Sequence, residues 1–308
     1  MKKPQYNCVQ AIDVGSNAAW GVVAKKGGRG EVEVMVDEER ITGLGRGSFG
    51  QKRLSTDGME RAEQAIRELV ERGKRAGAEW VGAFGTSALR EAINADEFIR
   101  RFDGVVHRFR VLSGEEEGML AFEGARMMLN LVGSCAVVDV GGGSTEVALG
   151  EAKVEKVWSL PLGSLRLHEV FVRKQPLDDA EIRSLSAAID KELDCAQIDS
   201  LPEVVAISGT AITCGCVARG YDHKDYPNVH GLTVEREELD EMACTFLKRR
   251  VEEVISDRRV DPRRAPYFGV GAMILSRIAR RSKFERIRVS LGGLRHAIAK
   301  RVLDGENW

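Results

Sequence analysis

The chain has 308 residues, of which 43% are hydrophobic and 30% are charged, and its formal net charge is −1. This composition is typical of a globular protein, and the length suits two domains that each bury a core. No apolar run approaches the ~18 residues of a membrane span, and the start, Met-Lys-Lys-Pro-Gln-Tyr, lacks the apolar stretch of a signal peptide. The six cysteines match no zinc spacing, and we interpret Cys214 and Cys216 as part of a buried loop of small residues. We therefore predict a reduced, cytoplasmic protein without a membrane partner.

Two segments share one pattern, in which a β-branched strand runs into a tight turn of small residues. They are Val9–Asn17 and Ala136–Glu146, and each continues into a second apolar strand. Asp13 and Asp139, at corresponding places, stand 126 residues apart. A hairpin that opens each half of the chain indicates an internal duplication.

Between the two hairpins, strands alternate with helices. Ser55 can cap a helix whose apolar residues recur at helical spacing. Ser113 and Glu116 form a capping-box sequence, so a helix should run from Ser113 to about Leu131. Further strands are expected at Glu31–Val36, Glu39–Thr42, Trp80–Gly85 and Val105–Leu112, and a further helix at Ser87–Arg101.

The second half repeats this order, with strands first and helices later. The strand Val204–Ile207 leads into a third small-residue turn, Ser208–Thr210. Helices are expected near Asp179–Asp194, Arg236–Ile255 and Tyr267–Arg281, followed by a strand at Ile287–Ser290 and a closing helix from Leu294. Alternating strands and helices predict the α/β class. We place the domain boundary at Gly133, which gives domains 1–132 and 133–308, and the closing helix is expected to pack back on the first domain.

Positive charge gathers late in the sequence. From Lys248 to Arg288, thirteen Lys and Arg stand against five Asp and Glu. Such a run suits an extended polyanion, and a set of solvated helix faces explains it equally well. Aromatic residues do not alternate with the basic ones, so we expect no nucleic-acid partner.

The glycine turns are candidate phosphate sites. Glycine lets backbone N–H groups converge on an anion without interference from a Cβ atom. Tight hairpins need glycine in any case, so one such turn says little, whereas three turns after β-branched strands are stronger evidence. Neither a P-loop sequence nor a dinucleotide-binding fingerprint occurs. The candidate phosphate-binding residues are Gly15, Ser16, Asn17, Gly141, Gly142, Gly143, Ser144, Thr145, Gly209 and Thr210.

Three carboxylates accompany the turns. Asp13 and Asp139 end hydrophobic strands, and Glu146 follows the longest glycine turn. Such an aspartate can simply close its turn through the backbone. Carboxylates at strand ends are also what Mg²⁺ prefers, and bound phosphate needs a cation to offset its charge. We therefore assign these three residues to a Mg²⁺ (or Mn²⁺) site.

Two further residues are candidates for catalysis. Glu117 stands one residue beyond those that the helix dipole and the capping box explain, so it could orient an attacking water molecule. Arg90 follows a predicted buried strand, where its guanidinium can hold phosphoryl oxygens in a bidentate way. An ordinary helix-surface role explains each of them about equally well.

In these stretches the chain resembles the Ppx/GppA family of exopolyphosphatases and guanosine pentaphosphate phosphohydrolases. The resemblance implies a duplicated actin-like (ribonuclease H-like) fold with the active site in the interdomain cleft, Mg²⁺ dependence and a homodimer. It implies that Glu117 is the catalytic glutamate, that Arg90 is the family's arginine, and that Asp13, Asp139 and Glu146 are the phosphate- and metal-associated acids. The matching stretches, which run in family order, are Ala11–Asn17, Thr86–Arg90, Val111–Glu117, Val138–Glu146, Ser159–Leu167, Ser208–Thr210 and Ser290–Arg295.

Two positions depart from that resemblance. Trp20 stands where many members have a basic residue, and Ser208 replaces a glycine. We predict an exopolyphosphatase that hydrolyses terminal phosphoanhydride bonds of inorganic polyphosphate and releases orthophosphate. The alternatives are a guanosine pentaphosphate (pppGpp) 5′-phosphohydrolase, a non-catalytic sensor of polyphosphate or of a guanosine alarmone, and a kinase that shares the actin-like fold.

Overall fold

The computed structural model describes residues 6–28, 31–198 and 200–308. These form two compact units, Met1–Leu120 with Leu294–Trp308, and Ala121–Gly293. The division falls inside helix α5 (Gly114–Leu129), whereas the boundary predicted from the sequence lies at Gly133. Residues 1–5, on which the signal-peptide argument rested, lie outside the described residues. In the described part of the chain, no helix is long and apolar enough to cross a membrane.

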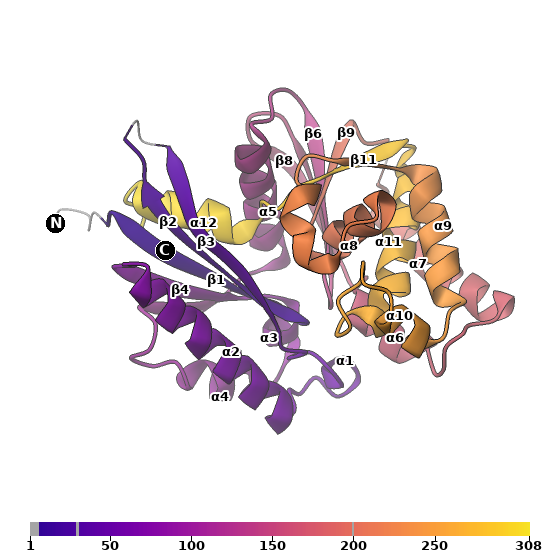
Figure 1. Ribbon diagram of the computed structural model, residues 1–308, viewed down its shortest axis with the longest axis horizontal. Coiled ribbons are helices and arrows are strands. Elements are labelled where there is room, and N and C mark those ends of the chain that lie inside the picture. Colours follow the sequence, from indigo (N-terminus) through magenta and orange to yellow (C-terminus); the bar gives the residue numbers. More distant parts are fainter. Residues whose placement is uncertain (1–5, 29–30, 199) are drawn as a thin grey trace. The chain divides into compact units, whose positions relative to one another are not determined.

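The first unit is built on a five-stranded sheet in the order β3-β2-β1-β4-β5 (Figure 1). The neighbours β1, β4 and β5 are parallel, and the β1–β2 and β2–β3 pairs are antiparallel. Its strands are β1 (Cys8–Val14), β2 (Ala18–Lys26), β3 (Val32–Ile41), β4 (Trp80–Gly85) and β5 (Arg108–Val111).

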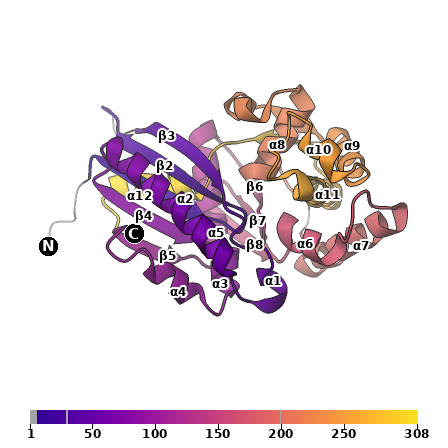
Figure 2. The same ribbon diagram turned by 60° about the horizontal axis from the view of Figure 1, so that its bottom comes forward.

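This sheet is buried on both faces. Ile12 and Val14 of β1 pack in one cluster with α2 (Thr56–Arg75), and Val9 and Ala11 pack in another with α12 (Leu294–Leu303). Side chains alternate between the faces of a strand, so α2 and α12 cover opposite faces (Figure 2). The unit also contains the short helices α1 (Ser48–Gln51), α3 (Ser87–Glu91) and α4 (Ala95–Arg100).

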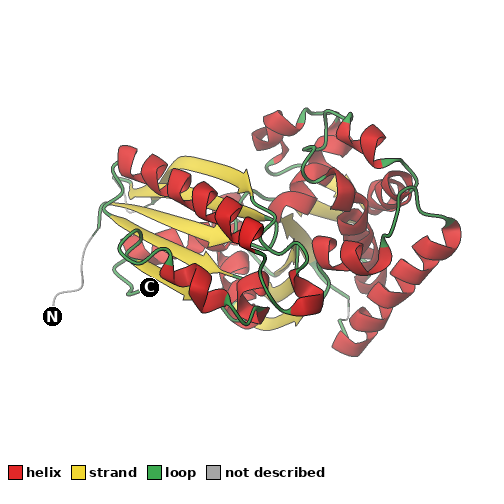
Figure 3. Cartoon of the chain, turned by 90° about the horizontal axis from the view of Figure 1, so that it is seen from below, coloured by secondary structure: helices red, strands yellow, loops and turns green. Residues whose placement is uncertain are grey.

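The second unit is built on a six-stranded sheet in the order β10-β11-β9-β6-β7-β8. Its strands are β6 (Cys135–Val140), β7 (Thr145–Gly150), β8 (Val154–Leu160), β9 (Glu203–Ile207), β10 (Thr233–Glu235) and β11 (Arg286–Val289). Its helices are α6 (Ser164–Phe171), α7 (Asp179–Ala196), α8 (Ser208–Arg219), η1 (His223–Val229), α9 (Arg236–Leu247), α10 (Val251–Ile255) and α11 (Ala265–Ser282). Figure 3 shows the helices of the chain in red and its strands in yellow.

The two sheets confirm the internal duplication. In each sheet an antiparallel three-stranded run is followed by a parallel strand: the strands β3-β2-β1-β4 of the first sheet correspond in order to β8-β7-β6-β9 of the second. The opening hairpins close with the same hydrogen bond, from Gly15 N–H to the Ala18 carbonyl at 2.9 Å and from Gly141 N–H to the Ser144 carbonyl at 3.0 Å. The strands and helices therefore confirm the predicted α/β class.

Both predicted helix starts are confirmed. The Ser55 hydroxyl accepts a hydrogen bond from Gly58 N–H, which caps α2. At α5, Ser113 N–H donates to the Glu116 carboxylate at 2.9 Å, and Glu116 N–H donates to the Ser113 hydroxyl at 3.1 Å. This is the expected capping box.

Tertiary contacts overturn other expectations. The predicted helix Ser87–Arg101 is interrupted, because the Asn94 side chain both accepts from Leu54 N–H and donates to the Leu54 carbonyl. The two strands expected in 31–42 form the single strand β3, which pairs with β2 along its length. The helix expected at Arg236–Ile255 divides into α9 and α10, where Arg250 and Glu253 form a new cap.

Cys214 and Cys216 are buried, as predicted, but they lie in helix α8 rather than in a loop. The third small-residue turn is in fact the first turn of this helix. Burial raises the pKa of the Cys216 thiol to about 11 and also raises the pKa of Cys214. Both thiols are therefore packing residues and poor nucleophiles.

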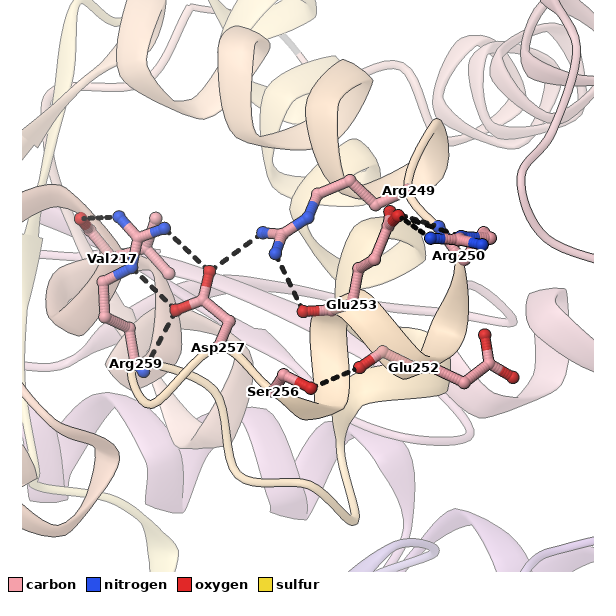
Figure 4. A network of polar contacts seen from close by, with 8 residues as sticks. All are labelled: Val217, Arg249, Arg250, Glu252, Glu253, Ser256, Asp257 and Arg259. Atoms are coloured by element: carbon pink, nitrogen blue, oxygen red, sulfur yellow. Dashed lines mark hydrogen bonds and ion pairs between the residues drawn. The ribbon is translucent and has the colours of Figure 1, made fainter.

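The basic run from Lys248 to Arg288 is largely paired with carboxylates. Arg249 and Arg259 both bind Asp257, and hydrogen bonds from Arg259 hold the pKa of that carboxyl well below its usual range (Figure 4). This pairing favours the solvated-face interpretation over a polyanion track. Other pairs in the run are Lys248–Asp179, Arg250–Glu253, Arg263–Asp261, Arg277–Asp190, Arg280–Asp240, Arg281–Asp194 and Arg288–Glu203.

Candidate active site

A row of polar side chains crosses the sheet of the second unit. Asp139 on β6 lies directly opposite Glu146 on β7, which lies opposite Ser159 on β8. Directly opposed residues of antiparallel strands share a face, so these three side chains stand on the same face of the sheet. Ser159 donates to Glu146 at 2.8 Å, and Ser208, which follows β9, donates to Asp139 at 2.6 Å. Each acid of this polar row is therefore held by a serine hydroxyl.

The glycine turn between β6 and β7 is fixed through its carbonyl groups. The Gly141 carbonyl accepts from Ser164 N–H at 3.0 Å, and the Gly142 carbonyl accepts from Leu165 N–H at 2.9 Å. The Gly143 carbonyl accepts from Arg166 Nε at 2.6 Å. The amino-terminal turn of α6 thus anchors the carbonyl side of this hairpin.

The backbone N–H groups of the same β6–β7 turn differ from its carbonyl groups in their hydrogen bonding. Within the described part of the chain, the backbone N–H groups of Gly142, Gly143 and Ser144 make no hydrogen bond. Three consecutive N–H groups without a protein acceptor form the kind of concave nest that binds anions. We call this feature the amide cradle.

The turn of the first unit has the same arrangement in a smaller form. The Ser16 carbonyl accepts from Gly45 N–H at 2.7 Å, and the Asn17 carbonyl accepts from Thr42 N–H at 2.9 Å. Among the residues that the structure describes, the N–H groups of Ser16 and Asn17 donate to no protein acceptor. The Asn17 side-chain oxygen is also buried without a hydrogen-bond partner in that part of the chain.

Two of the predicted hydroxyl ligands are directed inward. The Thr145 hydroxyl is fully buried and donates to the Leu162 carbonyl. The Thr210 hydroxyl donates to the Val140 carbonyl at 2.9 Å. Each hydroxyl proton is therefore donated to a backbone carbonyl of the protein, and the two threonines stabilise the backbone around the β6–β7 turn. The side chain of Ser144 is buried at the end of the amide cradle.

Glu117 and Arg90 are brought together in the first unit. Glu117 is 6% exposed, and its Oε2 accepts from Arg90 Nη1 at 2.9 Å. The same Nη1 donates to the Leu112 carbonyl at 2.9 Å. Arg90 thus ties the Glu117 carboxylate to the end of β5, which fixes its direction at the base of α5.

Trp20 belongs to a buried ionic cluster. It lies opposite Asp13 across the β1–β2 pair, is 6% exposed, and has the Arg295 guanidinium 4.6 Å above its ring. Arg295 in turn forms a bidentate pair with Asp37, with both bonds at 2.8 Å. The guanidinium of Arg295, from α12, therefore lies beside position 20 and is held there by the Trp20 ring and by Asp37 of β3.

Breaking this cluster should be costly. Burial would raise the pKa of Asp37, but the Arg295 charge and the His296 hydrogen bond outweigh it and hold that pKa well below its usual value. Asp37→Asn removes the carboxylate charge that pairs with the buried Arg295, so we expect the free energy of unfolding to fall by about 3 kcal/mol at pH 7. Because the folded-state pKa is depressed, this contribution exists above the unfolded-state pKa of about 4 and is lost as the pH falls further. Urea unfolding of both proteins between pH 7 and pH 3 would measure it.

The exposed pair of Lys300, on α12, and Asp304, just after it, provides the control, since Lys300 Nζ and Asp304 Oδ2 lie 2.6 Å apart at the surface. Asp304→Asn should cost less than about 1 kcal/mol. The stabilising role of the buried pair would be contradicted if the two variants lost equal free energies of unfolding. It would also be contradicted if the loss in Asp37→Asn did not become smaller between pH 7 and pH 3.

The donor set suits a hard divalent cation. Asp139 and Glu146 offer carboxylate oxygens from neighbouring strands, and oxygen ligands are those that Mg²⁺ takes. In residues 6–28, 31–198 and 200–308, no group of three or more His, Cys, Asp or Glu side chains is placed to hold a metal ion. The residues present fit a cation that is completed by water and substrate phosphates, as is usual for Mg²⁺.

An α/β fold with a duplicated hairpin, an amide cradle and carboxylates nearby is typical of proteins that bind phosphoryl groups. The chain belongs to a family described as the Ppx/GppA phosphatase family, whose model matches residues 22–306. The resemblance seen in the sequence motifs is thereby confirmed.

Individual relatives agree with this assignment. The chain is 29% identical to exopolyphosphatase 2 of Mycobacterium tuberculosis over 286 residues, which cover 88% of this chain and 90% of that protein. It is 28% identical to guanosine-5′-triphosphate,3′-diphosphate pyrophosphatase of Vibrio cholerae, with 73% of this chain and 51% of that protein covered. The solved structure of the Aquifex aeolicus PPX-GPPA enzyme is 30% identical and has a TM-score of 0.81, covering 96% of this chain and 99% of its own. The fold is therefore actin-like.

Proposed function

We propose that this chain is an exopolyphosphatase, a phosphoric anhydride hydrolase that removes orthophosphate from the end of inorganic polyphosphate. The observation that carries the proposal is the amide cradle, whose carbonyls are all anchored while its N–H groups have no acceptor in the described chain. The similarity to exopolyphosphatase 2 of Mycobacterium tuberculosis supports the same substrate class.

In this proposal phosphoryl oxygens are bound by the amide cradle (Gly142, Gly143 and Ser144), which Gly141 and Thr145 flank, and by the turn Gly15–Asn17. Gly209 and Thr210, in the first turn of α8, complete the proposed phosphate-binding residues. Phosphoryl transfer depends mainly on positioning and on electrostatic stabilisation, because its transition state spreads negative charge over several oxygens. Fixed backbone N–H groups stabilise that charge without reorganising. The anchoring of the cradle by α6 supplies this fixity.

Glu117 is the proposed general base. Its carboxylate accepts a proton from the attacking water, whose oxygen bonds to the terminal phosphorus. The bond from that phosphorus to the bridging oxygen breaks, so that the shortened polyphosphate leaves with the bridging oxygen and orthophosphate is released. Arg90 holds Glu117 in one direction through Nη1, and its guanidinium supplies positive charge for phosphoryl oxygens. We propose these two as the catalytic residues.

The cofactor is proposed to be Mg²⁺ or Mn²⁺, held by Asp139 and Glu146 together with Asp13. When bound, the ion would offset the charge of the phosphate chain. Ser208 and Ser159 orient two of these carboxylates.

Phosphate release from long-chain polyphosphate, pppGpp and ATP, each supplied alone with Mg²⁺, tests the function. We expect the highest kcat/KM on polyphosphate. A preference for pppGpp would instead support the alternative reaction, to which the Vibrio cholerae relative points. Tight binding of polyphosphate with no phosphate released at any metal concentration would contradict catalysis and favour a sensor. Turnover of ATP only when an acceptor is added would favour a kinase.

The assembly and location predicted from the sequence belong to the same proposal. We propose a cytoplasmic homodimer, and light scattering on the purified chain should give twice the mass of one chain. A monomer at micromolar concentration would contradict the dimer.

A further inference from the structure

Ser208 has an unusual backbone conformation for its place in the fold. It is the first residue of α8 and has a φ of 62°, in the left-handed region. Among the described residues, the other non-glycine residues with positive φ lie at or just after helix ends, where this conformation is common. They are Lys52, Asn130, Gln197 and Lys283. Ser208 begins a helix, so helix termination does not explain its strain.

Glycine would adopt this φ without strain, because it has no Cβ atom. A strained residue persists only where its surroundings over-determine it, and such residues gather at functional sites. A side-chain contact that glycine would lose offsets such strain.

That contact is with Asp139. Asp139 pairs with Ile207 in the parallel β6–β9 register, so Ser208 is the next residue beyond the strand. In the left-handed conformation its Oγ lies 2.6 Å from Asp139 Oδ1 and 3.3 Å from the Val140 carbonyl. One hydroxyl carries one proton, and the shorter, charge-assisted bond to the carboxylate takes it.

We propose that Ser208 is a positioning residue, whose hydroxyl holds the Asp139 carboxylate in the orientation that the reaction uses. This role rests on the proposed function, in which Asp139 serves the phosphate site. Ser208 itself touches neither water nor substrate in the reaction; it acts through Asp139. The Thr210 hydroxyl donates to the backbone carbonyl of Val140, next to Asp139, whereas the Ser208 hydroxyl donates to the Asp139 carboxylate.

Two substitutions separate the hydroxyl from the backbone. Ser208→Gly and Ser208→Ala both remove the hydroxyl, whereas only glycine relieves the strain. We expect both to lower kcat by about tenfold, because each loses one hydrogen bond to a charged group, with KM changed by less than about twofold. Ser208→Gly should have the higher melting temperature of the two, by a few degrees.

Lys283 is the matched control for strain. It has a φ of 57° and is exposed at the end of α11. Lys283→Gly should raise the melting temperature and keep wild-type kcat. The proposal is overturned if Ser208→Gly keeps wild-type kcat, or if Ser208→Ala alone loses activity, since the loss would then follow strain rather than the hydroxyl.

A double-mutant cycle without substrate tests the contact by itself. If Ser208 acts on Asp139, the urea midpoints of Ser208→Ala, Asp139→Ala and the double variant are non-additive, with a smaller effect of Ser208→Ala when Asp139 is absent. Additive shifts would overturn the proposal. If the wild-type chain releases phosphate from no substrate, the proposed function fails, and the cycle still decides whether Ser208 holds Asp139.

Discussion

Glu117→Gln should lower the turnover number on polyphosphate by ~10²–10⁴-fold, the usual contribution of a general base. Glutamine has the same shape, and its carbonyl oxygen can still accept the hydrogen bond that Arg90 Nη1 makes to Glu117 at 2.9 Å. The folded structure and the binding of the phosphate chain should therefore change little, while proton abstraction from water is lost. Initial rates of phosphate release, together with the Kd for polyphosphate by calorimetry, measure the two effects separately.

Glu116 is the matched control, one residue earlier on the same helix. Its carboxylate accepts from Ser113 N–H at 2.9 Å in the capping box, a role that glutamine also fills. Glu116→Gln should keep turnover within about twofold. Wild-type turnover in Glu117→Gln would remove this residue from the base role, and equal losses in both variants would assign the effect to the helix.

Gly163→Ala should lower kcat/KM by at least ~10²-fold. A Cβ atom at position 163 would lie 2.3 Å from the Gly142 carbonyl oxygen and 2.4 Å from the Gly143 carbonyl carbon. Both are backbone atoms, so the turn itself must move. A displacement near 1 Å at a site that works by positioning costs about that factor. Steady-state phosphate release measures the loss, and circular dichroism verifies that the variant is folded.

Gly50→Ala provides the control for this substitution, because a Cβ at position 50 meets nothing within 4 Å. It should keep wild-type activity. Arg166→Ala gives a milder second variant, since it removes the 2.6 Å bond from Arg166 Nε to the Gly143 carbonyl and places no new atom against the turn. We expect a loss of about tenfold in kcat/KM from it. Full activity in a folded Gly163→Ala variant would contradict the role of the amide cradle.

The class of the fold and its hairpins could be predicted because their signals are local. Strand patterns, glycine turns and the capping box at Ser113 each occupy a few consecutive residues, and the structure contains the two opening hairpins and the capping box. The break between α3 and α4 had no local signal. It depends on hydrogen bonds between Asn94 and Leu54, 40 residues apart in the chain.

The candidate site divides in the same way. Glycine turns and acids at strand ends could be predicted from the residue types in the sequence, and the pairing of Asp139 with Glu146 follows from the hairpin. The directions of the Thr145 and Thr210 hydroxyls were not readable, because a sequence does not give a rotamer. The cluster of Trp20 with Arg295 could not be predicted either, because it joins residues from the two ends of the chain.

Ser159 and Arg166 were missed as supporting residues. Ser159 faces Glu146 only through the β7–β8 register, which includes an irregularity near Leu149, and Arg166 reaches the amide cradle through the placement of α6. Both lie in the stretch Ser159–Leu167 that carried part of the family resemblance. The signal was therefore present as a motif, although its physical role required the structure.

We propose that the chain hydrolyses the terminal anhydride bond of a phosphate chain. The most direct test is to incubate a polyphosphate of uniform length with the wild-type chain and Mg²⁺, and to follow both orthophosphate and the remaining chain lengths on a gel. We expect orthophosphate as the only small product, with chains shortened from their ends, and at most about a hundredth of that rate with Glu117→Gln. Internal fragments without orthophosphate, or no cleavage of polyphosphate or pppGpp, would contradict the claim.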